Sequence, residues 1–419
     1  MGLFLVIVGY VLALLATLLG IGLVVLVVSI LRTEHNYRDF PGPKRDSFLL
    51  GNILSIMGTK ETLGQPFGIL MYTLTLEHGP VFWMRIFSRA HIIASVPEVV
   101  KELLLNSRHI KPLRFYHHFQ YMFGTRFMGT GLVSEINHDK WFHKRAIINP
   151  AFRRKYLMGM MEKFNSETEN LCEHLVGKAD GQTEVEMLDE FNNVTLDVIA
   201  NVAFSMSTGA IGDPSCPFPT AFNACLRGQE TTSDLLSFTI QQLGRNPEVA
   251  KKLQAEVDEV LGQKSYIEYE DLAKLEYMMM VFKETLRLYP PVIGTSRVTA
   301  HPIKYKDLTI PAGVEVSVLS SVMARMEEYF DDPLLFNPDR FKPREDDKLP
   351  RHIYAFFPFS IGQRSCIGQQ FALIEARVIL GKLLQRFEFH FNQSQRTVML
   401  DELTMKPLDK CKNYLTLRA

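Results

Sequence analysis

The sequence predicts a mainly α-helical fold with small β-sheets, preceded by one transmembrane helix. Three observations lead to this prediction. The N-terminal segment is apolar, several later segments repeat apolar side chains every three or four residues, and a few short apolar runs have the length of strands. A hydrophobic fraction of 47% is sufficient for a large buried core without disulfides or structural metals.

Residues 2–31 contain no charged side chain and are rich in Leu, Val and Ile. About 20 apolar residues suffice to cross a bilayer core of roughly 30 Å, whereas a cleavable signal peptide has a shorter apolar run. We therefore expect residues 1–31 to be a retained transmembrane anchor. Basic residues follow this run and no charged residue precedes it, so the positive-inside tendency places the rest of the chain in the cytosol.

The sequence after the anchor predicts a hinge and then one domain. Two prolines around a glycine at residues 40–43 cannot continue a helix, so we expect residues 32–46 to form a stiff hinge. Residues 47–419 contain no repeat and no low-complexity linker, which predicts a continuous domain. Lys plus Arg and Asp plus Glu both number 46, so the overall charge does not favour a nucleic-acid partner. The five scattered cysteines indicate a reducing environment.

Two helices and three strands can be placed from the apolar pattern. Residues 271–289 repeat apolar side chains at helical spacing and end at a pair of prolines. A second amphipathic helix is expected directly after Gly368, with its apolar stripe continuing to Phe387. Short apolar runs predict strands at residues 81–86, 90–96 and 314–319.

The segment FSIGQRSCIG, which begins at Phe359, places Cys366 between Gly362 and Gly368. The glycines permit a tight loop, and its backbone N–H groups and the following helix N-terminus are expected to favour thiolate over thiol. An inert buried cysteine is the alternative. The segment resembles the haem-binding loop of the cytochromes P450, with every position of FxxGxRxCxG filled. The resemblance implies haem b (iron protoporphyrin IX) as cofactor, Cys366 as the axial iron ligand and Arg364 facing a propionate.

Other residues match further motifs of this family. Glu284 and Arg287 have i, i+3 spacing, and Arg340 lies in a segment that resembles the family's PxRF motif. The resemblance implies a buried network of these three residues that supports the cysteine loop. Trp141 and Arg145 match the family's WxxxR helix, whose two members reach a propionate. The alternatives are an exposed ion pair, and a core tryptophan beside an exposed arginine.

Arg297 fits a further propionate-binding cation, since arginine binds carboxylates in bidentate geometry. The segment Gly228-Gln229-Glu230-Thr231-Thr232 resembles the oxygen-activation segment of the family's long distal helix. By that resemblance Glu230 and Thr231 relay protons during catalysis. An ordinary helix start with Thr and Glu in its first turn is the alternative.

The chain is short for this family, and the shortage is localised at Leu226 and Arg227. A helix that crosses a domain of ~45 Å needs about 30 residues at roughly 1.5 Å each. Only 24 residues lie between Pro219 and Gly244. We therefore expect an internal deletion at this junction and an incomplete roof over the distal side of the cofactor.

The resemblance covers nearly the whole chain, and stretches such as RLYPPVIGTSR are most similar to the family's sterol 24-hydroxylases. It implies a monooxygenase that hydroxylates a sterol, cholesterol at carbon 24 in particular. The domain would face the cytosol from the endoplasmic reticulum membrane and receive electrons from NADPH–cytochrome P450 reductase. Residues 292–295 are expected to line the substrate side, with residues 115–123 as weaker candidates.

Basic residues at 143–145 and 153–155 are candidates for docking of the reductase, although an ordinary solvated helix face is an equal alternative. Two other functions stay open. The incomplete roof would be compatible with a catalytically impaired membrane protein that binds haem. An anchored scaffold without haem conflicts with the several haem-related motifs.

Overall fold

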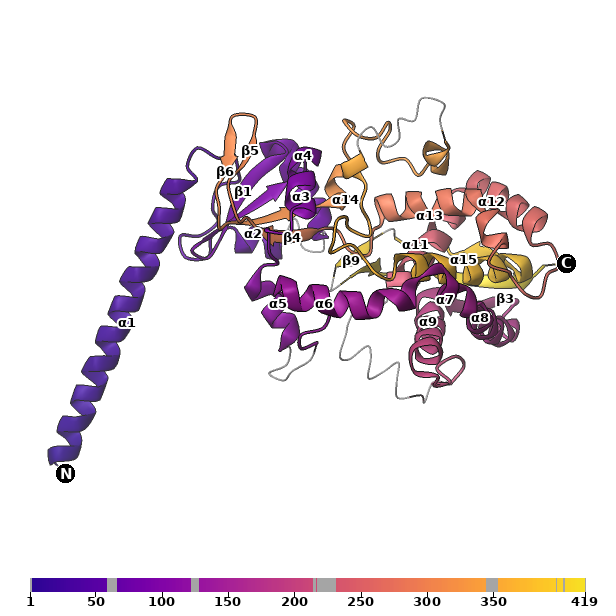
Figure 1. The fold of residues 1–419 in the computed structure, drawn as a ribbon, viewed down its shortest axis with the longest axis horizontal. Coiled ribbons are helices and arrows are strands. Elements are labelled where there is room, and N and C mark those ends of the chain that lie inside the picture. The colour runs from indigo at the N-terminus through magenta and orange to yellow at the C-terminus, as the bar shows by residue number, and fades with distance from the viewer. Residues whose placement is uncertain are drawn as a thin grey trace.

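The computed structural model describes residues 2–58, 66–121, 128–213, 216, 231–343, 353–396, 398–401 and 404–418. This part of the chain forms a helix-rich body beside a smaller portion that contains a four-stranded sheet (Figure 1). The predicted fold class, mainly helical with small sheets and a long apolar N-terminal helix, is confirmed.

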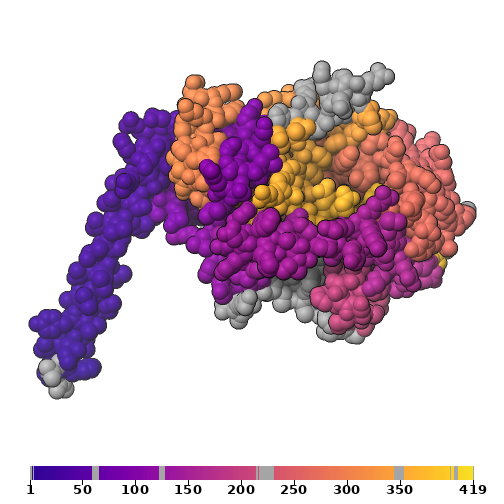
Figure 2. Space-filling view, in the orientation of Figure 1, coloured from indigo at the N-terminus to yellow at the C-terminus, as the bar shows by residue number. Residues whose placement is uncertain are grey.

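Helix α1 (Gly2–Asn36) stands clear of the body over most of its length (Figure 2). Over Phe4–Asn36 it is long and apolar enough to cross a membrane, and its most apolar window buries nothing against the protein. The helix continues to Asn36, beyond the apolar run that ends at Leu31. The last turn of α1, residues 33–36, is therefore polar and lies outside the apolar run.

The end of α1 and the segment after it pack on the β1–β2 hairpin. Glu34 forms ion pairs with Arg45 and with the buried Arg85, at 3.2 Å from the Arg85 Nε atom. The Tyr37 ring stacks on Trp83 with ring centroids 5.2 Å apart. These contacts hold the expected hinge region against the sheet, because the Glu34–Arg85 ion pair and the Tyr37–Trp83 stack each join the two.

The four-stranded sheet has the order β1-β2-β7-β4, with β2 and β7 parallel and the other pairs antiparallel. Strands β1, β2 and β7 agree with the three predicted strands to within two residues at each end, whereas β4 was not predicted. Their bounds are β1 (Val81–Ile86), β2 (Arg89–Ala94), β7 (Glu315–Val318) and β4 (Thr295–Val298).

Three smaller sheets complete the strand content of the described chain. One is three-stranded, with β11 between β3 and β8, and the other two are hairpin-like pairs. Their strands are β3 (Asp180–Glu186), β8 (Phe387–Phe391), β11 (Lys412–Leu417), β5 (Ile303–Tyr305), β6 (Leu308–Ile310), β9 (Met399–Asp401) and β10 (Met405–Pro407).

The predicted helix at residues 271–289 is interrupted. A 3₁₀ turn, η3 (Asp271–Ala273), precedes α13 (Glu276–Leu288), because Leu275 at the start of α13 has a non-helical backbone. The helix predicted after Gly368 forms as α15 (Gln369–Arg386). The other long helices are α6 (His138–Ile148), α8 (Met161–Val176), α9 (Met187–Phe204), α11 (Thr231–Arg245) and α12 (Pro247–Val260).

Helix α3 and several shorter helical segments connect these elements. They are α2 (Ile53–Met57), α3 (Phe67–His78), α4 (Pro97–Leu105), α5 (Leu113–Gln120), α7 (Arg154–Gly159), α14 (Ser320–Met323), η2 (Asn149–Phe152), η4 (Pro338–Phe341) and η5 (Ile353–Ala355). The main core lies where α8, α9, α11, α13 and α15 meet. Every side chain of α11 from Ser233 to Leu243 is buried, so this helix runs through the centre of the body.

Glu375 on α15 is a buried carboxyl group that hydrogen-bonds Thr232 of α11. Burial raises the pKa of Glu375 to about 8. The unfolded chain ionises near pH ~4.3, so the stability that protonated Glu375 contributes is complete below that pH and is lost as pH rises towards 8. Glutamine does not ionise, so Glu375→Gln should not lose this stability as pH rises.

We expect Glu375→Gln to be more stable than the wild type at pH 8, by roughly 4–5 kcal/mol, and to match it near pH 4. Thermal unfolding followed by circular dichroism across this pH range measures the difference. Glu388→Gln, at an exposed position of β8, is the matched control. If the wild type and Glu375→Gln lost the same stability as pH rises, Glu375 would not be the group responsible for the pH dependence.

Candidate cofactor site

The loop that carries Cys366 is closed by its own backbone hydrogen bonds. The Cys366 N–H donates to the Phe359 carbonyl oxygen at 2.8 Å, and the Ser365 N–H donates to that of Gly362 at 3.1 Å. Gly362 has a φ of +74°, and a Cβ atom there would lie 2.3 Å from the Leu104 carbonyl oxygen. Only glycine fits this position, which explains the first glycine of the motif.

The Cys366 thiol combines an exposed side chain with opposing influences on its pKa. Burial of the sulfur by neighbouring protein atoms raises the pKa, while backbone N–H groups of Gly368 and Gln369 and the charge of Arg145 lower it. The net pKa is raised, because desolvation outweighs these interactions. The expected preference for thiolate is therefore not a property of the loop alone. A coordinated metal ion deprotonates such a thiol by its own charge.

Helix α6 brings Trp141 and Arg145 to the cysteine loop, with partners that sequence reasoning did not foresee. The Arg364 guanidinium lies over the buried Trp141 ring, 4.0 Å from the ring centroid. Arg145 donates to the Ser365 carbonyl oxygen at 2.9 Å. Trp141 therefore positions Arg364, and Arg145 holds the loop beside the sulfur.

Three cationic side chains converge at one small cavity: Arg297 from β4, Arg364 from the cysteine loop, and Lys111. Arg297 and Lys111 are 3% and 8% exposed. Burial lowers the pKa of all three, to about 10 for Arg364 and about 7 for Lys111, where the positive charge of neighbouring arginines adds to the effect. Among the described residues, none of the three forms an ion pair with a carboxylate.

Buried cations without anionic partners repel one another and are costly to desolvate. A ligand with two carboxylates at this cavity would remove that cost. The two propionates of haem fit this requirement, and the accessible Cys366 sulfur belongs to the same loop as Arg364.

Lys111 was missed by sequence reasoning, because a single lysine in a loop matches no motif. Its Nζ atom donates to the Val133 carbonyl oxygen at 2.6 Å and lies 4.2 Å from the Tyr116 ring centroid. These two contacts hold the ammonium group beside Arg297. The signal that identifies it is its burial, which only the folded chain reveals.

Lys111→Met is expected to weaken haem binding about tenfold, because one charge-assisted hydrogen bond to a carboxylate is lost. Haem transfer from the protein to apomyoglobin measures the change. Lys111→Arg should retain most of the affinity. Lys144→Met is the control, since Lys144 pairs with Glu135 at 2.7 Å. Equal haem transfer from the Lys111→Met protein and the wild type would exclude Lys111 from the site.

Glu284, Arg287 and Arg340 form a buried network. Arg287 Nε lies 2.7 Å from Glu284 Oε2, and Arg340 Nε lies 3.0 Å from Glu284 Oε1. The side chains of Glu284 and Arg287 are fully buried. Arg287 also donates to the carbonyl oxygens of Ala324, Pro333 and Leu335. The network therefore joins α13 to the chain between α14 and η4.

The oxygen-activation segment is only partly within the described chain. Glu230, Gly228, Arg227 and Leu226 lie outside the described residues. Thr231 is the first residue of α11 and its side chain is exposed. Thr231 is thus the first described residue of this helix, and the expected relay and deletion junction stay predictions.

The candidate docking residues lie at the surface or close to it, whereas the candidate substrate residues include both exposed and buried side chains, such as Tyr116. Lys144 is bound by Glu135, and the Arg154 guanidinium lies 5.2 Å from the Tyr269 ring centroid, so both have partners within the chain. The side chains of His143, Arg153 and Lys155 are exposed. Of the substrate candidates, Val292 and Phe115 are exposed, and Phe123 lies outside the described residues.

Comparison with known proteins identifies a family for this arrangement. The cytochrome P450 family model matches residues 41–227 and 218–414. Cytochrome P450 4d2 of Drosophila melanogaster is 25% identical over 456 residues, which cover 83% of this chain and 88% of the relative. Human cytochrome P450 3A7 is 40% identical over 162 residues, or 39% of this chain and 32% of the relative.

An 11-oxo-beta-amyrin 30-oxidase of Glycyrrhiza uralensis is 28% identical over 379 residues, which cover 67% of this chain and 71% of the relative. Several shorter matches, such as that to 3A7, span only about a third of the relative. The relatives named as cytochromes P450 belong to types 4 and 3A. They do not support the expected resemblance to a cholesterol 24-hydroxylase.

Proposed function

Because the chain belongs to the cytochrome P450 family, we propose that it is a membrane-anchored haem-thiolate monooxygenase with Cys366 as the axial iron ligand. Bound haem supplies the oxidation chemistry: one atom of dioxygen enters the substrate as a hydroxyl, and the other leaves as water at the expense of two electrons. The protein supplies the thiolate, the charges that hold the propionates, and the placement of the substrate.

The observation that carries this proposal is the set of three cations at the loop of Cys366: the buried Arg297 and Lys111, and the half-buried Arg364. Burial lowers the pKa values of Arg297, Arg364 and Lys111, and two propionates would provide anionic partners for them. Arg145 contributes indirectly by holding the loop through Ser365. The buried network around Glu284 maintains the fold on which this loop is built.

For the substrate we propose an apolar, sterol-like molecule, with cholesterol at carbon 24 as the first candidate. The support is the stretch RLYPPVIGTSR, whose residues 292–295 lead into β4 and Arg297. Glu230 and Thr231 are the proposed carriers of protons during oxygen activation.

Electrons are proposed to come from NADPH–cytochrome P450 reductase at the endoplasmic reticulum membrane, where α1 would anchor the chain. A membrane-bound reductase can reach the catalytic domain only if both face the same side. The exposed side chains of His143, Arg153 and Lys155 are candidates for electrostatic docking, since complementary charge mainly raises association rates.

A second candidate function is a catalytically impaired haem-binding membrane protein. The two matches to the family model meet at residues 218–227, where the deletion was expected. The alignment to the Drosophila relative has 456 positions but uses only 83% of 419 residues, so roughly a hundred positions have no counterpart here. A missing roof would open the distal side to water and leave the pocket without an apolar wall.

Restoration of the missing segment tests both candidates. Sequencing of transcripts across the junction would supply the segment, and both forms are compared in the same membranes with reductase. We expect the present chain to hold less haem and to hydroxylate cholesterol far more slowly per haem. Equal turnover per haem would show that the segment is dispensable. Hydroxylation of other apolar molecules but not cholesterol, by the restored form, would refute the sterol assignment.

A further inference from the structure

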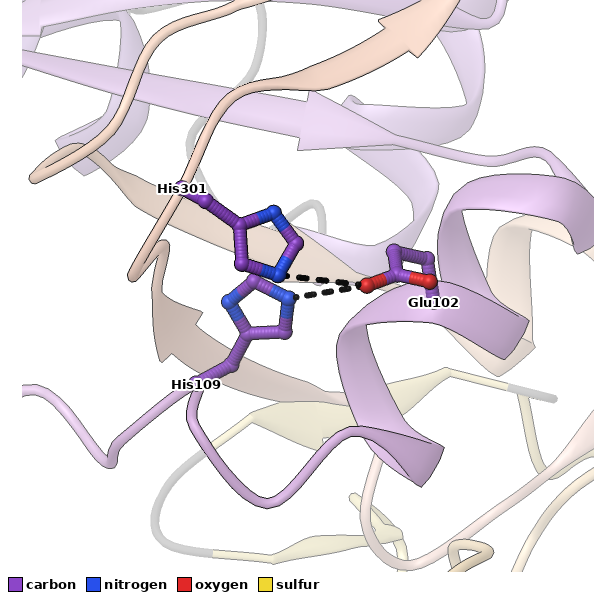
Figure 3. A group of neighbouring side chains, drawn as sticks. All are labelled: Glu102, His109 and His301. Carbon is purple, nitrogen blue, oxygen red and sulfur yellow. Dashed lines mark hydrogen bonds and ion pairs between the residues drawn. The ribbon is translucent and has the colours of Figure 1, made fainter.

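Three side chains with metal-binding atoms meet outside the cofactor site, and no motif in the sequence includes them (Figure 3). Glu102 lies in α4, His109 lies in the loop that follows, and His301 lies in the turn between β4 and β5. Their ligand atoms are all within 4.8 Å of one another.

The separations are close to those of a tetrahedral metal site. Glu102 Oε1 lies 3.4 Å from His109 Nε2 and 3.5 Å from His301 Nε2. Bonds of about 2.0–2.2 Å to a tetrahedral Zn²⁺ separate neighbouring ligand atoms by roughly 3.4 Å. Two of the three separations therefore already fit. The third separation, between the nitrogen atoms of the two histidines, is within 4.8 Å, and the His301 side chain is partly exposed.

His301 already has the protonation pattern of a metal ligand. Its Nδ1 atom lies 3.3 Å from the Pro302 carbonyl oxygen, and its Nε2 atom accepts a hydrogen bond from the Asn106 side-chain amide at 3.1 Å. A hydrogen on Nδ1 leaves the Nε2 lone pair on the Asn106 amide nitrogen, which also donates to Glu102 Oε1 at 2.9 Å. A metal ion bound by Glu102 and His301 would therefore take the place of this amide. Metal-bound histidines usually donate their second N–H to a carbonyl or carboxylate in this way.

His109 must change to bind a metal. Its Nδ1 atom accepts the Ala300 N–H at 3.0 Å, so the neutral ring carries its hydrogen on Nε2 and donates it to Glu102. Coordination through Nε2 moves this hydrogen to Nδ1 and releases the Ala300 amide. Metal binding therefore competes with one backbone hydrogen bond and alters the turn that contains His301.

We propose that Glu102, His109 and His301 form a binding site for a divalent late transition metal, with zinc as the expected ion. Two imidazoles and one carboxylate suit Zn²⁺, whereas Mg²⁺ and Ca²⁺ prefer oxygen ligands. Arg297 precedes His301 in β4 and the following turn, and Lys111 follows His109 in its loop. A bound ion would clamp the two segments that carry these propionate-binding candidates.

Zinc binding to the full chain, purified without a histidine tag, tests this site by equilibrium dialysis and elemental analysis. An accessible thiol also binds zinc, so every variant is compared both with Cys366 and in a Cys366→Ser background. We expect one zinc ion per chain, and at least tenfold weaker binding in His301→Ala and in Glu102→Gln. His390→Ala, at an exposed position in β8, is the matched control and should retain binding.

Cobalt absorption provides a second readout that does not depend on haem or turnover. Co²⁺ added to the wild type should give the visible bands of a four-coordinate ion, and His301→Ala should lack them. Circular dichroism verifies that each variant is folded. The proposal would be overturned if the wild type retained no more zinc than His301→Ala. It would also be overturned if His390→Ala lost as much zinc as His301→Ala. Neither result would affect the proposed monooxygenase function.

Discussion

Replacement of Arg287 by alanine is expected to destabilise the folded chain by roughly 3–5 kcal/mol, a large part of the stability of an ordinary domain. The variant would leave the Glu284 carboxylate buried with Arg340 as its remaining cationic partner among the described residues. The carbonyl oxygens of Ala324 and Pro333 would also lose Arg287 as a donor, while that of Leu335 would keep Arg340. Such groups cannot recover hydrogen bonds to water without opening the core.

Thermal unfolding and the yield of folded protein in membranes measure this effect. Arg386→Ala is the matched control, because Arg386 pairs with Glu169 and Glu173 at the surface, where ion pairs contribute less than about 1 kcal/mol. Arg287→Lys should be intermediate, since it keeps the charge but cannot reach the same set of acceptors. Equal stabilities of Arg287→Ala and Arg386→Ala would contradict the role assigned to the network.

Cys366→Ser is expected to abolish thiolate ligation of haem completely. Cys172 and Cys411 are the matched controls, because both are buried and burial raises the pKa of each thiol to about 12. The absorption spectrum of the reduced, carbon monoxide-bound haem should therefore be unchanged in Cys172→Ser, Cys411→Ser and Cys216→Ser. The same result is expected for Cys225→Ser, although Cys225 lies outside the described residues. Loss of the thiolate spectrum in any control would place the ligand elsewhere.

The elements that the sequence predicted well depend on local patterns. The helix after Gly368 and the strand at residues 81–86 form at the expected places, because apolar periodicity and a glycine boundary are both local. The helix at residues 271–289 was predicted as continuous, yet its start is a separate 3₁₀ turn. The reason is the backbone conformation at Leu275, which periodicity does not report.

The parts of the candidate site that sequence reasoning missed depend on contacts between distant segments. The stacking of Arg364 on Trp141 and the position of Lys111 beside Arg297 join residues more than a hundred positions apart. The raised pKa of the Cys366 thiol also follows from burial in the folded chain, while the motif shows only the local hydrogen bonds that lower it. Motifs therefore identified the chemistry, and the fold determined which groups assist it.

The spectrum of the reduced, carbon monoxide-bound protein tests the central claim most directly. Membranes that contain the full chain, and matched membranes with Cys366→Ser, are compared after normalisation to bound haem. We predict that the haem held by the wild type gives the red-shifted Soret band of thiolate ligation, and that Cys366→Ser gives none. A thiolate band that persists in Cys366→Ser, or a wild-type band typical of histidine ligation, would contradict the assignment of Cys366.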